Sequence, residues 1–595
     1  MDLLNKLPSP IGLTHNEIMN ILFTEEYGYL PSKPTSFEAE PFKKEEPKFC
    51  AGKAVFKSLK FTVKAEWGEF SFPLYYVCPK KNAPVPAFIH INFRDDIPDR
   101  YQPTEEIIDA GYATLTFCYK DVSSDDGDFT SGLAGVVYKN GRPFGACGKI
   151  GLWAYAACAV LEYALTLPEL DGTKICVAGH SRLGKTALLA GALDERFYCA
   201  FSNDSGCGGA SLARENTGED IKAIVTRFPY WFCEKYQSYA ENEDSMPFDQ
   251  HYLLAANSAH KVYVASAAED AWACPQNEYL SCVAASEYFE KNGKVGFVHH
   301  DRLPNVGECF HKGNIGYHLR EGTHFMSRED WKCYINFLNG VSAVQYESVK
   351  PYPRICAHRG FNTVAPENTL PAFGAAVALG ADEIEFDIWS TSDGVLVSCH
   401  DSTLDRVSDG EGNVYEKTYA ELLKLDFGCK AGEKFKGLKI TTFEEILQKF
   451  AGRVIMNIHV KIWDKNFPDD KMEEIIGLVR KYDCARHVYF MTRSDRMIKK
   501  VMEYAPDIKC CVGWNKNKTD FMEIVNRAVA LGAYKIQLFK PYFDEETVKA
   551  AHANGILCNV FWADDPEEAR LYRKWGIDTI LTNDYLSIKN ALEAK

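Results

Sequence analysis

Eight short apolar stretches alternate with helix-like stretches between residues 350 and 595, and this alternation limits the possible folds more than any other feature. The eight predicted strands are residues 354–358, 384–388, 454–460, 488–491, 509–514, 535–539, 557–561 and 579–581. A strand followed by a helix, repeated eight times within one domain, is the pattern of a (β/α)8 TIM barrel. The longer stretch 395–447 is predicted to be an insertion on the rim of this barrel.

The first half of the chain predicts a different α/β arrangement. A hairpin-like pair of strands comes first, and single strands then alternate with helices, which predicts an α/β sheet covered on both faces. The predicted strands are residues 58–67, 69–78, 86–93, 113–119, 174–178, 199–202, 261–267 and 295–300. Because 595 residues are too many for one core and Pro351 and Pro353 interrupt the pattern, we expect two domains, 1–345 and 350–595.

A serine flanked by glycines stands at the centre of the first domain. The sequence Gly179-His-Ser181-Arg-Leu-Gly184 joins the predicted strand 174–178 to a predicted helix at 184–193. A cramped corner of this kind exposes a serine hydroxyl and leaves backbone N–H groups free near the start of the helix. In the usual nucleophile elbow the second glycine comes one residue earlier, so a surface turn with a capping serine remains the alternative.

Composition excludes several classes of partner. A formal net charge of −15 argues against nucleic acid and anionic membranes as partners. No apolar run is long enough for a membrane span, and the first residues lack a basic segment followed by a long apolar stretch. The 20 cysteines form no Cys-x-x-Cys pair, which is typical of a reducing compartment without a zinc site. We therefore expect a cytoplasmic protein, and the oligomeric state stays open.

Several motifs of the first domain, in the correct order, resemble the glucuronoyl esterases of carbohydrate esterase family 15. They include Gly179-His-Ser-Arg-Leu-Gly-Lys185, Ser202-Asn-Asp-Ser-Gly206, Ser266-Ala-Ala-Glu-Asp-Ala-Trp-Ala273 and Tyr317-His-Leu-Arg-Glu-Gly-Thr-His324. These enzymes are α/β-hydrolases that cleave esters of the glucuronic acid carboxyl group. The resemblance implies Ser181 as the nucleophile and His324 as the general base, because a serine hydroxyl needs an imidazole to take its proton.

A carboxylate must orient that imidazole, and the family offers two positions for it. Asp270 follows the predicted strand 261–267, as in the order serine, aspartate, histidine that is usual for these hydrolases. Asp204 lies after the preceding strand, where many relatives have the longer glutamate. We predict that Asp270 has the main role and that Asp204 assists it.

The resemblance implies further contacts to the substrate and no cofactor in this domain. Arg182 would help to stabilise the oxyanion, since a fixed cation suits the developing negative charge. Lys185 would contact the sugar acid. Trp272 and Trp231 could stack on a sugar ring, although buried packing is equally compatible with each.

The polar residues of the second domain gather where the predicted strands end, which is the catalytic face of such a barrel. They resemble the glycerophosphodiester phosphodiesterases, and the resemblance covers nearly the whole domain. The motifs are His358-Arg359-Gly360, Pro366-Glu367-Asn-Thr369, Glu385-x-Asp387, His400-Asp401 and Asp578-Thr-Ile-Leu-Thr-Asn583.

A phosphodiester carries a negative charge that repels nucleophiles, so a divalent cation is expected to screen it. Glu385 and Asp387 lie two residues apart in a strand and point to one face, where they would hold Mg²⁺ or Ca²⁺ together with Glu367. The resemblance implies His358 and His400 as the groups that accept and donate a proton.

One position departs from the family pattern. Where the family usually has a third metal-binding glutamate, this chain reads Asn457-Ile-His459-Val-Lys461, so His459 points into the site instead. An imidazole favours Mn²⁺ or Zn²⁺ over Mg²⁺, and the alternative is a weakened site or another substrate. Arg359 and Lys461 are expected to contact the phosphate. Trp514, with Trp562, would line the pocket.

Together these features predict a bifunctional hydrolase. A serine esterase for small uronic-acid or related carbohydrate esters would be fused to a metal-dependent glycerophosphodiester phosphodiesterase. Within the enzymes, the alternative is a carbohydrate acetyl esterase followed by a degenerate barrel. From a different class, the barrel could be a binding module for sugar phosphates without catalysis.

Overall fold

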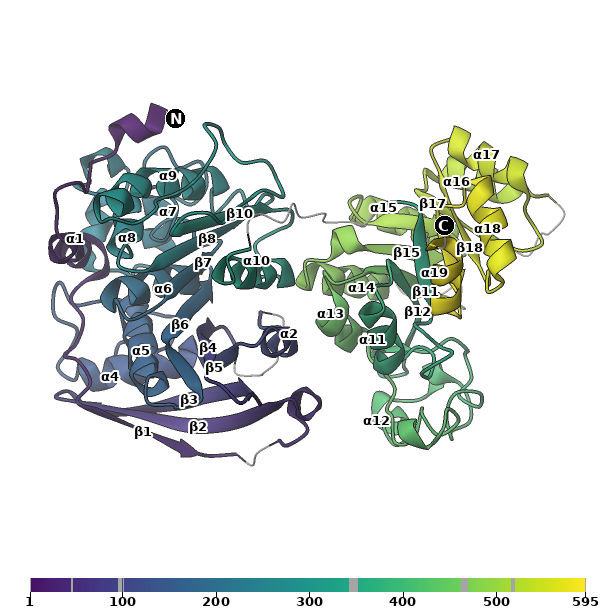
Figure 1. The fold of residues 1–595 in the computed structure, drawn as a ribbon, viewed down its shortest axis with the longest axis horizontal. Coiled ribbons are helices and arrows are strands. Elements are labelled where there is room, and N and C mark those ends of the chain that lie inside the picture. The colour runs from purple at the N-terminus through teal and green to yellow at the C-terminus, as the bar shows by residue number, and fades with distance from the viewer. Residues whose placement is uncertain are drawn as a thin grey trace. The chain divides into compact units, whose positions relative to one another are not determined.

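The computed structural model describes residues 2–43, 46–94, 99, 101–341, 351–461, 469–514 and 520–593. The chain divides into two compact units, Met1–Ser348 and Val349–Lys595 (Figure 1). The predicted boundary at residues 345–350 lies outside the described residues and stays a prediction.

The N-terminal unit contains a ten-stranded sheet in the order β1-β2-β3-β5-β4-β6-β7-β8-β10-β9. The strands are β1 Ser36–Pro41, β2 Ala54–Ala65, β3 Gly68–Pro79, β4 Val85–Asn92, β5 Ala113–Cys118, β6 Leu170–His180, β7 Cys199–Asn203, β8 Lys261–Ala267, β9 Cys309–Phe310 and β10 Ile315–Arg320. Strands β5, β4, β6, β7, β8 and β10 pair in parallel, whereas β1, β2, β3 and β9 pair antiparallel with their neighbours. The predicted α/β sheet is thereby confirmed.

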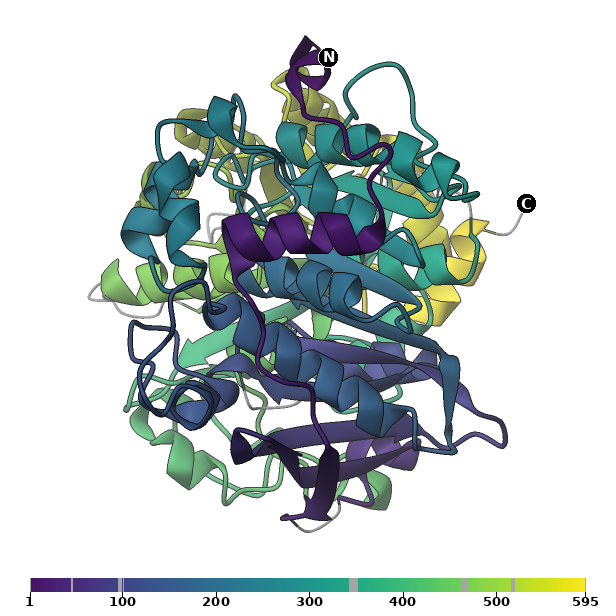
Figure 2. The same cartoon turned by 90° about the vertical axis from the view of Figure 1, so that its left-hand side faces the viewer.

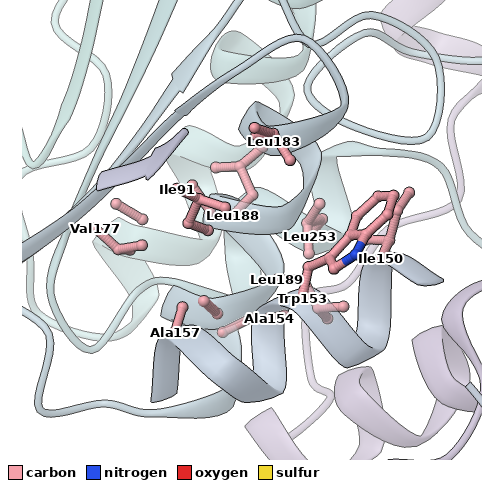
Figure 3. Packing of buried hydrophobic residues seen from close by; sticks show 14 of the residues in the cluster. Ile91, Ile150, Trp153, Ala154, Ala157, Val177, Leu183, Leu188, Leu189 and Leu253 are labelled. Atoms are coloured by element: carbon pink, nitrogen blue, oxygen red, sulfur yellow. The ribbon is translucent and has the colours of Figure 1, made fainter. Parts of the chain in front are cut away.

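Helices cover both faces of this sheet (Figures 1 and 2). They are α1 His15–Leu22, α2 Thr104–Asp109, α3 Tyr119–Val122, α4 Gly132–Val137, α5 Lys149–Ala164, α6 Arg182–Leu193, α7 Ile221–Arg227, α8 His251–Ala256, α9 Pro275–Lys291 and α10 Arg328–Leu338. Val177 of β6 packs with α5 and α6 (Figure 3), whereas its neighbour Ala178 belongs to the cluster formed with α10 on the opposite face. Alternate residues of a buried strand point to opposite faces, so the buried run 175–178 of β6 is apolar throughout.

One predicted strand is wrong. Residues 295–300 form no strand; Phe297 instead anchors an irregular segment by packing against Tyr279 and Phe310. The strand beside β8 is β10, which the prediction missed because it carries His318 and Arg320. Both side chains are buried, and both pair with the buried Asp330 of α10. A paired polar residue can lie in a core, but its hydrophilic character hides the strand from a search for apolar runs.

The C-terminal unit is the predicted (β/α)8 barrel. Its parallel strands are β11 Arg354–His358, β12 Glu383–Ser390, β14 Ile455–Val460, β15 Val488–Thr492, β16 Lys509–Val512, β17 Lys535–Phe539, β18 Leu557–Phe561 and β19 Thr579–Thr582. Strand β11 pairs with both β12 and β19, which closes the ring. The surrounding helices are α11 Leu370–Ala378, α13 Phe443–Phe450, α14 Asp469–Lys481, α15 Asp495–Tyr504, α16 Glu523–Leu531, α17 Glu545–Ala553, α18 Pro566–Trp575 and α19 Tyr585–Glu593.

The segment between β12 and α13 interrupts the barrel repeat. It contains the short strand β13 Leu396–Ser398, antiparallel to β12, and the short helix α12 Tyr419–Leu422. It has a small core of its own, formed by Trp389, Val397, Cys399, Leu404, Val414, Leu422, Phe427 and Ile440. This core holds the segment, which includes His400 and Asp401, against the end of β12.

None of the helices in the described ranges is both long and apolar enough to cross a membrane.

Candidate active sites

Ser181 lies at the corner between β6 and α6 in a strained conformation. Its φ of 57° and ψ of −127° are unusual for a residue with a side chain, and such a conformation costs about 1–3 kcal/mol. The surrounding structure fixes it, because the Ser181 N–H donates to the carbonyl of Asn203 over 2.8 Å. A Cβ on Gly179 would lie 2.1 Å from the carbonyl oxygen of Leu183, so only glycine fits there. This geometry is that of a nucleophile elbow rather than a relaxed surface turn.

His324 lies in the loop that follows β10, and Asp270 lies just beyond the end of β8. The Nδ1–H of His324 donates to Oδ2 of Asp270 over 2.6 Å, which leaves Nε2 to accept a proton. The ring of His180, the residue before the serine, lies 4.5 Å from the His324 ring between centroids. The imidazole therefore lies beside the elbow, oriented by a nearly buried carboxylate.

Asp204 lies behind this pair. Asp204, Asp270 and His324 each have a side-chain oxygen or ring nitrogen in this place, and these three atoms lie within 4.8 Å of one another. The Asp204 carboxylate accepts the backbone N–H of Ala267 over 2.7 Å and faces Arg320 at 3.4 Å, and burial raises its pKa well above the usual range. Asp270 thus contacts the imidazole directly, as predicted, whereas Asp204 is engaged by its own partners. The catalytic roles of both stay predictions.

The two aspartates can be separated by one pair of variants. Asp270→Asn is expected to lower the kcat of ester hydrolysis by about 10⁴-fold, because an amide no longer stabilises the imidazolium or its tautomer. Asp204→Asn is expected to cost at most about tenfold, since it has no direct contact to the ring. Measured kcat values of both variants check this, with circular dichroism as the control for folding. A larger loss in Asp204→Asn would reverse the assignment.

Arg320 and Asp330, two residues without a predicted role, fix the loop that carries the base. Arg320 donates to the carbonyls of Thr323 and Phe325, on either side of His324, and its Nε lies 2.9 Å from Asp330. Burial opposes the charge of Asp330, yet Arg320 and His318 hold its pKa below the usual range. The available signal was Ser327-x-x-Asp330, a capping box at the start of α10.

Arg182, predicted at the oxyanion, follows the nucleophile at the start of α6. Its guanidinium pairs with Asp125 and lies 4.7 Å above the ring of Trp231. Trp231 is buried, donates its indole N–H to Asp125 over 2.8 Å and stacks on Phe228. Packing therefore accounts for Trp231, and it holds Arg182 beside the elbow.

Lys185, predicted to contact the sugar acid, is buried one turn into α6. Its ammonium donates to the carbonyls of Ser205 and Cys207 and lies 3.6 Å from Glu219. Trp272 is 49% exposed, so its ring is accessible to a ligand. Substrate contacts of both residues stay predictions.

A cavity of about 540 Å³ opens at the carboxyl ends of the barrel strands. Nine residues predicted for this site line it: His358, Arg359, Glu385, Asp387, His400, His459, Lys461, Trp514 and Trp562. The barrel therefore brings together residues in or just after β11, β12, β13, β14, β16 and β18 that lie up to 204 positions apart in the chain.

Two carboxylates and an imidazole form a candidate cation site in this cavity. Glu385, Asp387 and His459 each offer one oxygen or nitrogen atom that could bind a cation, and these three atoms lie within 4.8 Å of one another. Burial and the neighbouring Asp387 raise the pKa of Glu385 to about 8. Two buried carboxylates side by side repel each other, so a divalent cation would relieve both the burial and the repulsion. The donor set therefore fits a metal ion.

Glu367, predicted as a further metal ligand, lies outside this group. Its carboxylate pairs with Arg359 at 3.0 Å and with two nitrogens of Arg406 at 2.7 and 2.8 Å. Arg406 belongs to the insertion, and no motif predicts that it contacts Glu367. Glu367 therefore holds Arg359 in place at the wall of the cavity.

His358 and His400 each have one ring nitrogen occupied. Nδ1 of His358 lies 2.9 Å from Oδ1 of Asn583, and Nδ1 of His400 lies 2.7 Å from Oδ1 of Asp401. Burial lowers the pKa of His358 to about 4 and also lowers the pKa of His400. Both rings are thus neutral near pH 7, with Nε2 available for proton transfer.

The predicted phosphate contacts are paired with carboxylates. Arg359 pairs with Glu367, and Nζ of Lys461 lies 2.7 Å from Oδ1 of Asp387. A further cation, Arg493, lines the cavity just after β15 and was missed. A single arginine after a strand carries no signal in the sequence.

The N-terminal unit thus has the elbow and the histidine–aspartate pair of a serine hydrolase, and the C-terminal unit has the carboxylate–histidine cavity of a barrel phosphodiesterase. A family model described as glucuronyl esterase, fungi, matches residues 61–293, and the glycerophosphoryl diester phosphodiesterase family matches residues 358–586. The chain belongs to both families: its first unit to the carbohydrate esterase family 15 glucuronoyl esterases and its second to the glycerophosphodiester phosphodiesterases.

Individual relatives agree with this assignment. Carbohydrate esterase MZ0003, from an unknown prokaryotic organism, is 39% identical over 236 residues, which are 39% of this chain and 54% of that protein. The chain thus spans about half the length of that relative. A glycerophosphodiester phosphodiesterase from Caldanaerobacter subterraneus subsp. tengcongensis is 33% identical over 39% of this chain and 93% of its own length.

A solved structure, the glucuronoyl esterase from Solibacter usitatus, is 30% identical to this chain with a TM-score of 0.51. The alignment covers 56% of this chain and 93% of that one.

Proposed function

We propose that the protein is a bifunctional hydrolase with two separate sites. One site hydrolyses glucuronoyl or related carbohydrate esters, and the other hydrolyses glycerophosphodiesters with the help of a divalent metal. The observation that carries the first activity is the 2.6 Å hydrogen bond between His324 and Asp270 beside the strained Ser181. The group of Glu385, Asp387 and His459 in the barrel cavity supports the second.

In the esterase site, Ser181 Oγ attacks the ester carbonyl while Nε2 of His324 takes its proton. Asp270 stabilises the resulting imidazolium. Arg182 directly follows the nucleophile in the chain, and its positive charge would favour the developing oxyanion. His324 then returns the proton to the leaving alcohol, and water releases the acid by the same steps.

In the barrel site, Glu385, Asp387 and His459 would hold the cation. When bound, a divalent cation screens the charge of the diester and polarises its phosphorus–oxygen bonds. The free Nε2 of one imidazole, His358 or His400, accepts a proton from the attacking group, and the other imidazole takes up a proton from solvent and passes it to the leaving alcohol. Arg359, held by Glu367, supplies a positive charge on the wall of the cavity.

An activity screen on the intact protein tests this function against its alternative. Methyl glucuronate and acetylated xylose serve as the ester substrates, and glycerophosphoglycerol serves as the diester, each with Mg²⁺, Ca²⁺, Mn²⁺ or Zn²⁺. Hydrolysis of methyl glucuronate and metal-stimulated cleavage of the diester are the expected results. Preference for acetylated xylose without diester cleavage would support an acetyl esterase with a degenerate barrel.

The residue at position 459 should set the metal preference. His459→Glu is expected to raise the ratio of Mg²⁺-supported to Mn²⁺-supported diester hydrolysis by about tenfold, because a carboxylate is a harder ligand than imidazole. The ratio of the two kcat/KM values measures this, and His459→Gln, which adds no charge, is the matched control. An unchanged ratio in His459→Glu would mean that the residue is not a ligand.

A reducing compartment such as the cytoplasm is the location that we propose. All twenty cysteines are free thiols, and most of them are buried. Even Cys309 and Cys333, whose Sγ atoms lie 3.8 Å apart, form no disulfide. Free thiols at such density are typical of proteins kept reduced.

A further inference from the structure

Arg493 differs from Arg359 and Lys461, which line the same barrel cavity, because no carboxylate of the described residues pairs with it. Arg359 and Lys461 pair with Glu367 and Asp387, respectively. Arg493 lines the same cavity, and within the described parts of the chain its guanidinium has neither a hydrogen bond nor an ion pair. A cation at a cavity wall without a protein counter-ion is suited to an anionic group of a ligand.

An arc of aromatic rings connects this cation to the reacting end of the cavity. The guanidinium of Arg493 lies 6.0 Å from the centroid of the Trp514 ring. Trp514 packs against Phe539 at 5.1 Å, and Phe539 packs against Trp562 at 5.7 Å between centroids. Trp562 in turn lies 6.5 Å from the imidazole of His358. All five residues line the cavity, so a sugar ring, whose C–H faces are apolar, has aromatic side chains to contact along this wall.

A buried donor lies in the wall of the same cavity. Gln537 of β17 is 2% exposed, and its Oε1 faces the amide nitrogen of Asn559 at 3.4 Å. Its Nε2 has no hydrogen-bond partner among the described residues. Buried polar groups are nearly always satisfied, and an orphaned donor is costly unless a ligand or water completes it. A hydroxyl or ring oxygen of a sugar is an acceptor of the required kind.

From these three observations we infer that the alcohol subsite of the barrel takes a uronic-acid sugar, with its ring on the aromatic arc and its free carboxylate on Arg493. This inference rests on the proposed phosphodiesterase function and narrows its substrate class to phosphodiesters of uronic acids. Glycerol alone has neither a ring to cover the arc nor an anion for the guanidinium.

The two sites then act in sequence on one compound. In the esterase site, water cleaves the uronate ester, so that the acyl carbon–oxygen bond breaks and an alcohol and a carboxylate with one released proton are formed. In the barrel, a second water cleaves a phosphorus–oxygen bond and yields a phosphomonoester and an alcohol. Only the product of the first step carries the negative charge that pairs with Arg493, so the ester form is the poorer substrate for the barrel.

Three matched diesters test this inference: sn-glycerol 3-phosphate joined to the 1-oxygen of glucose, of glucuronic acid or of methyl glucuronate. We expect kcat/KM for the glucuronic acid diester to exceed that for the glucose diester by about ten- to a hundredfold, the range of a charge-assisted hydrogen bond. In Arg493→Gln this ratio should fall to about one. Arg570→Gln, which alters an exposed arginine of α18 outside the cavity lining, is the control and should keep the ratio.

The methyl glucuronate diester tests the order of the two steps. The intact protein should cleave its phosphodiester bond after a lag, as the esterase frees the carboxylate, whereas Ser181→Ala should show the slow rate of the glucose diester throughout. Equal rates of diester cleavage in both proteins, without a lag, would overturn the proposed order of the two steps.

The remaining outcomes separate the inference from the function on which it rests. An equal loss on all three diesters in Arg493→Gln would assign this residue to the scissile phosphate and overturn the inference. The inference would also be overturned if the intact protein cleaved the three sugar diesters equally well, or if it cleaved glycerophosphoglycerol but none of the sugar diesters. If it cleaves no diester with any metal, the phosphodiesterase function fails and the inference with it.

Discussion

Replacing Ser181 by alanine is expected to lower the kcat of ester hydrolysis by about 10⁶-fold. Alanine fits the corner as well as serine does, so the fold should not change, but no nucleophile remains for His324 to activate. The measurement is the initial rate of methyl glucuronate hydrolysis by Ser181→Ala and by the unmodified protein at equal concentration.

Two further proteins sharpen this test. His324→Ala should show a similar loss, and the double variant should be no worse than either single one, because the two residues act as one unit. Diester hydrolysis by the barrel is the internal control for correct folding. Ester hydrolysis that survives in Ser181→Ala at more than one hundredth of the normal rate would contradict the assignment.

Removal of divalent metal is expected to abolish diester hydrolysis, a loss of more than about 10⁶-fold. Without a cation, Asp387 keeps its negative charge beside a negatively charged substrate, and the phosphorus centre is not polarised. The measurement is glycerophosphoglycerol cleavage after treatment with a chelator, followed by stepwise addition of Mn²⁺ or Mg²⁺.

The esterase serves as the control in the same sample. Asp204, Asp270 and His324 are also residue types that can bind metal. However, Asp204 is engaged by Arg320 and a backbone N–H, and His324 uses Nδ1 to contact Asp270. Ester hydrolysis should therefore be insensitive to the chelator. Diester cleavage that persists in the metal-free protein would refute the metal site. So would a failure of any added cation to restore cleavage in the unmodified protein.

The barrel could be predicted almost completely from the sequence. Its strands are short, largely apolar runs that are buried on both sides, and some of them carry polar site residues near their ends, such as His358 in β11 and Asp387 in β12. The local apolar pattern agrees with the buried environment of each strand. The ends of all eight predicted strands therefore lie within two residues of the observed ends.

The sheet of the N-terminal unit shows why prediction fails elsewhere. Strand β10 depends on Asp330, twelve residues beyond His318, for the pairing that makes its polar side chains tolerable in a core. Residues 295–300 are apolar enough for a strand, but the position beside β8 is occupied by β10. Both outcomes depend on partners that are distant along the chain.

The same limit applies to the two sites. The motif of Glu367 predicts a metal ligand, which stays a prediction, but it does not predict that Arg406 of the insertion pairs with this carboxylate. Asp270 and Asp204 could not be ranked with certainty, because the hydrogen bond to His324 depends on the path of a loop fixed by Arg320. Arg493 becomes noticeable only in the structure, where it lines the cavity and pairs with no carboxylate in the described part of the chain.

The most direct test of two separate catalytic sites is to assay both hydrolyses in parallel in the intact protein, in Ser181→Ala and in His358→Ala. We predict a crossed result, in which Ser181→Ala loses ester cleavage and keeps diester cleavage, while His358→Ala does the opposite. A single substitution that removes both activities, or two substitutions that remove neither, would contradict the account.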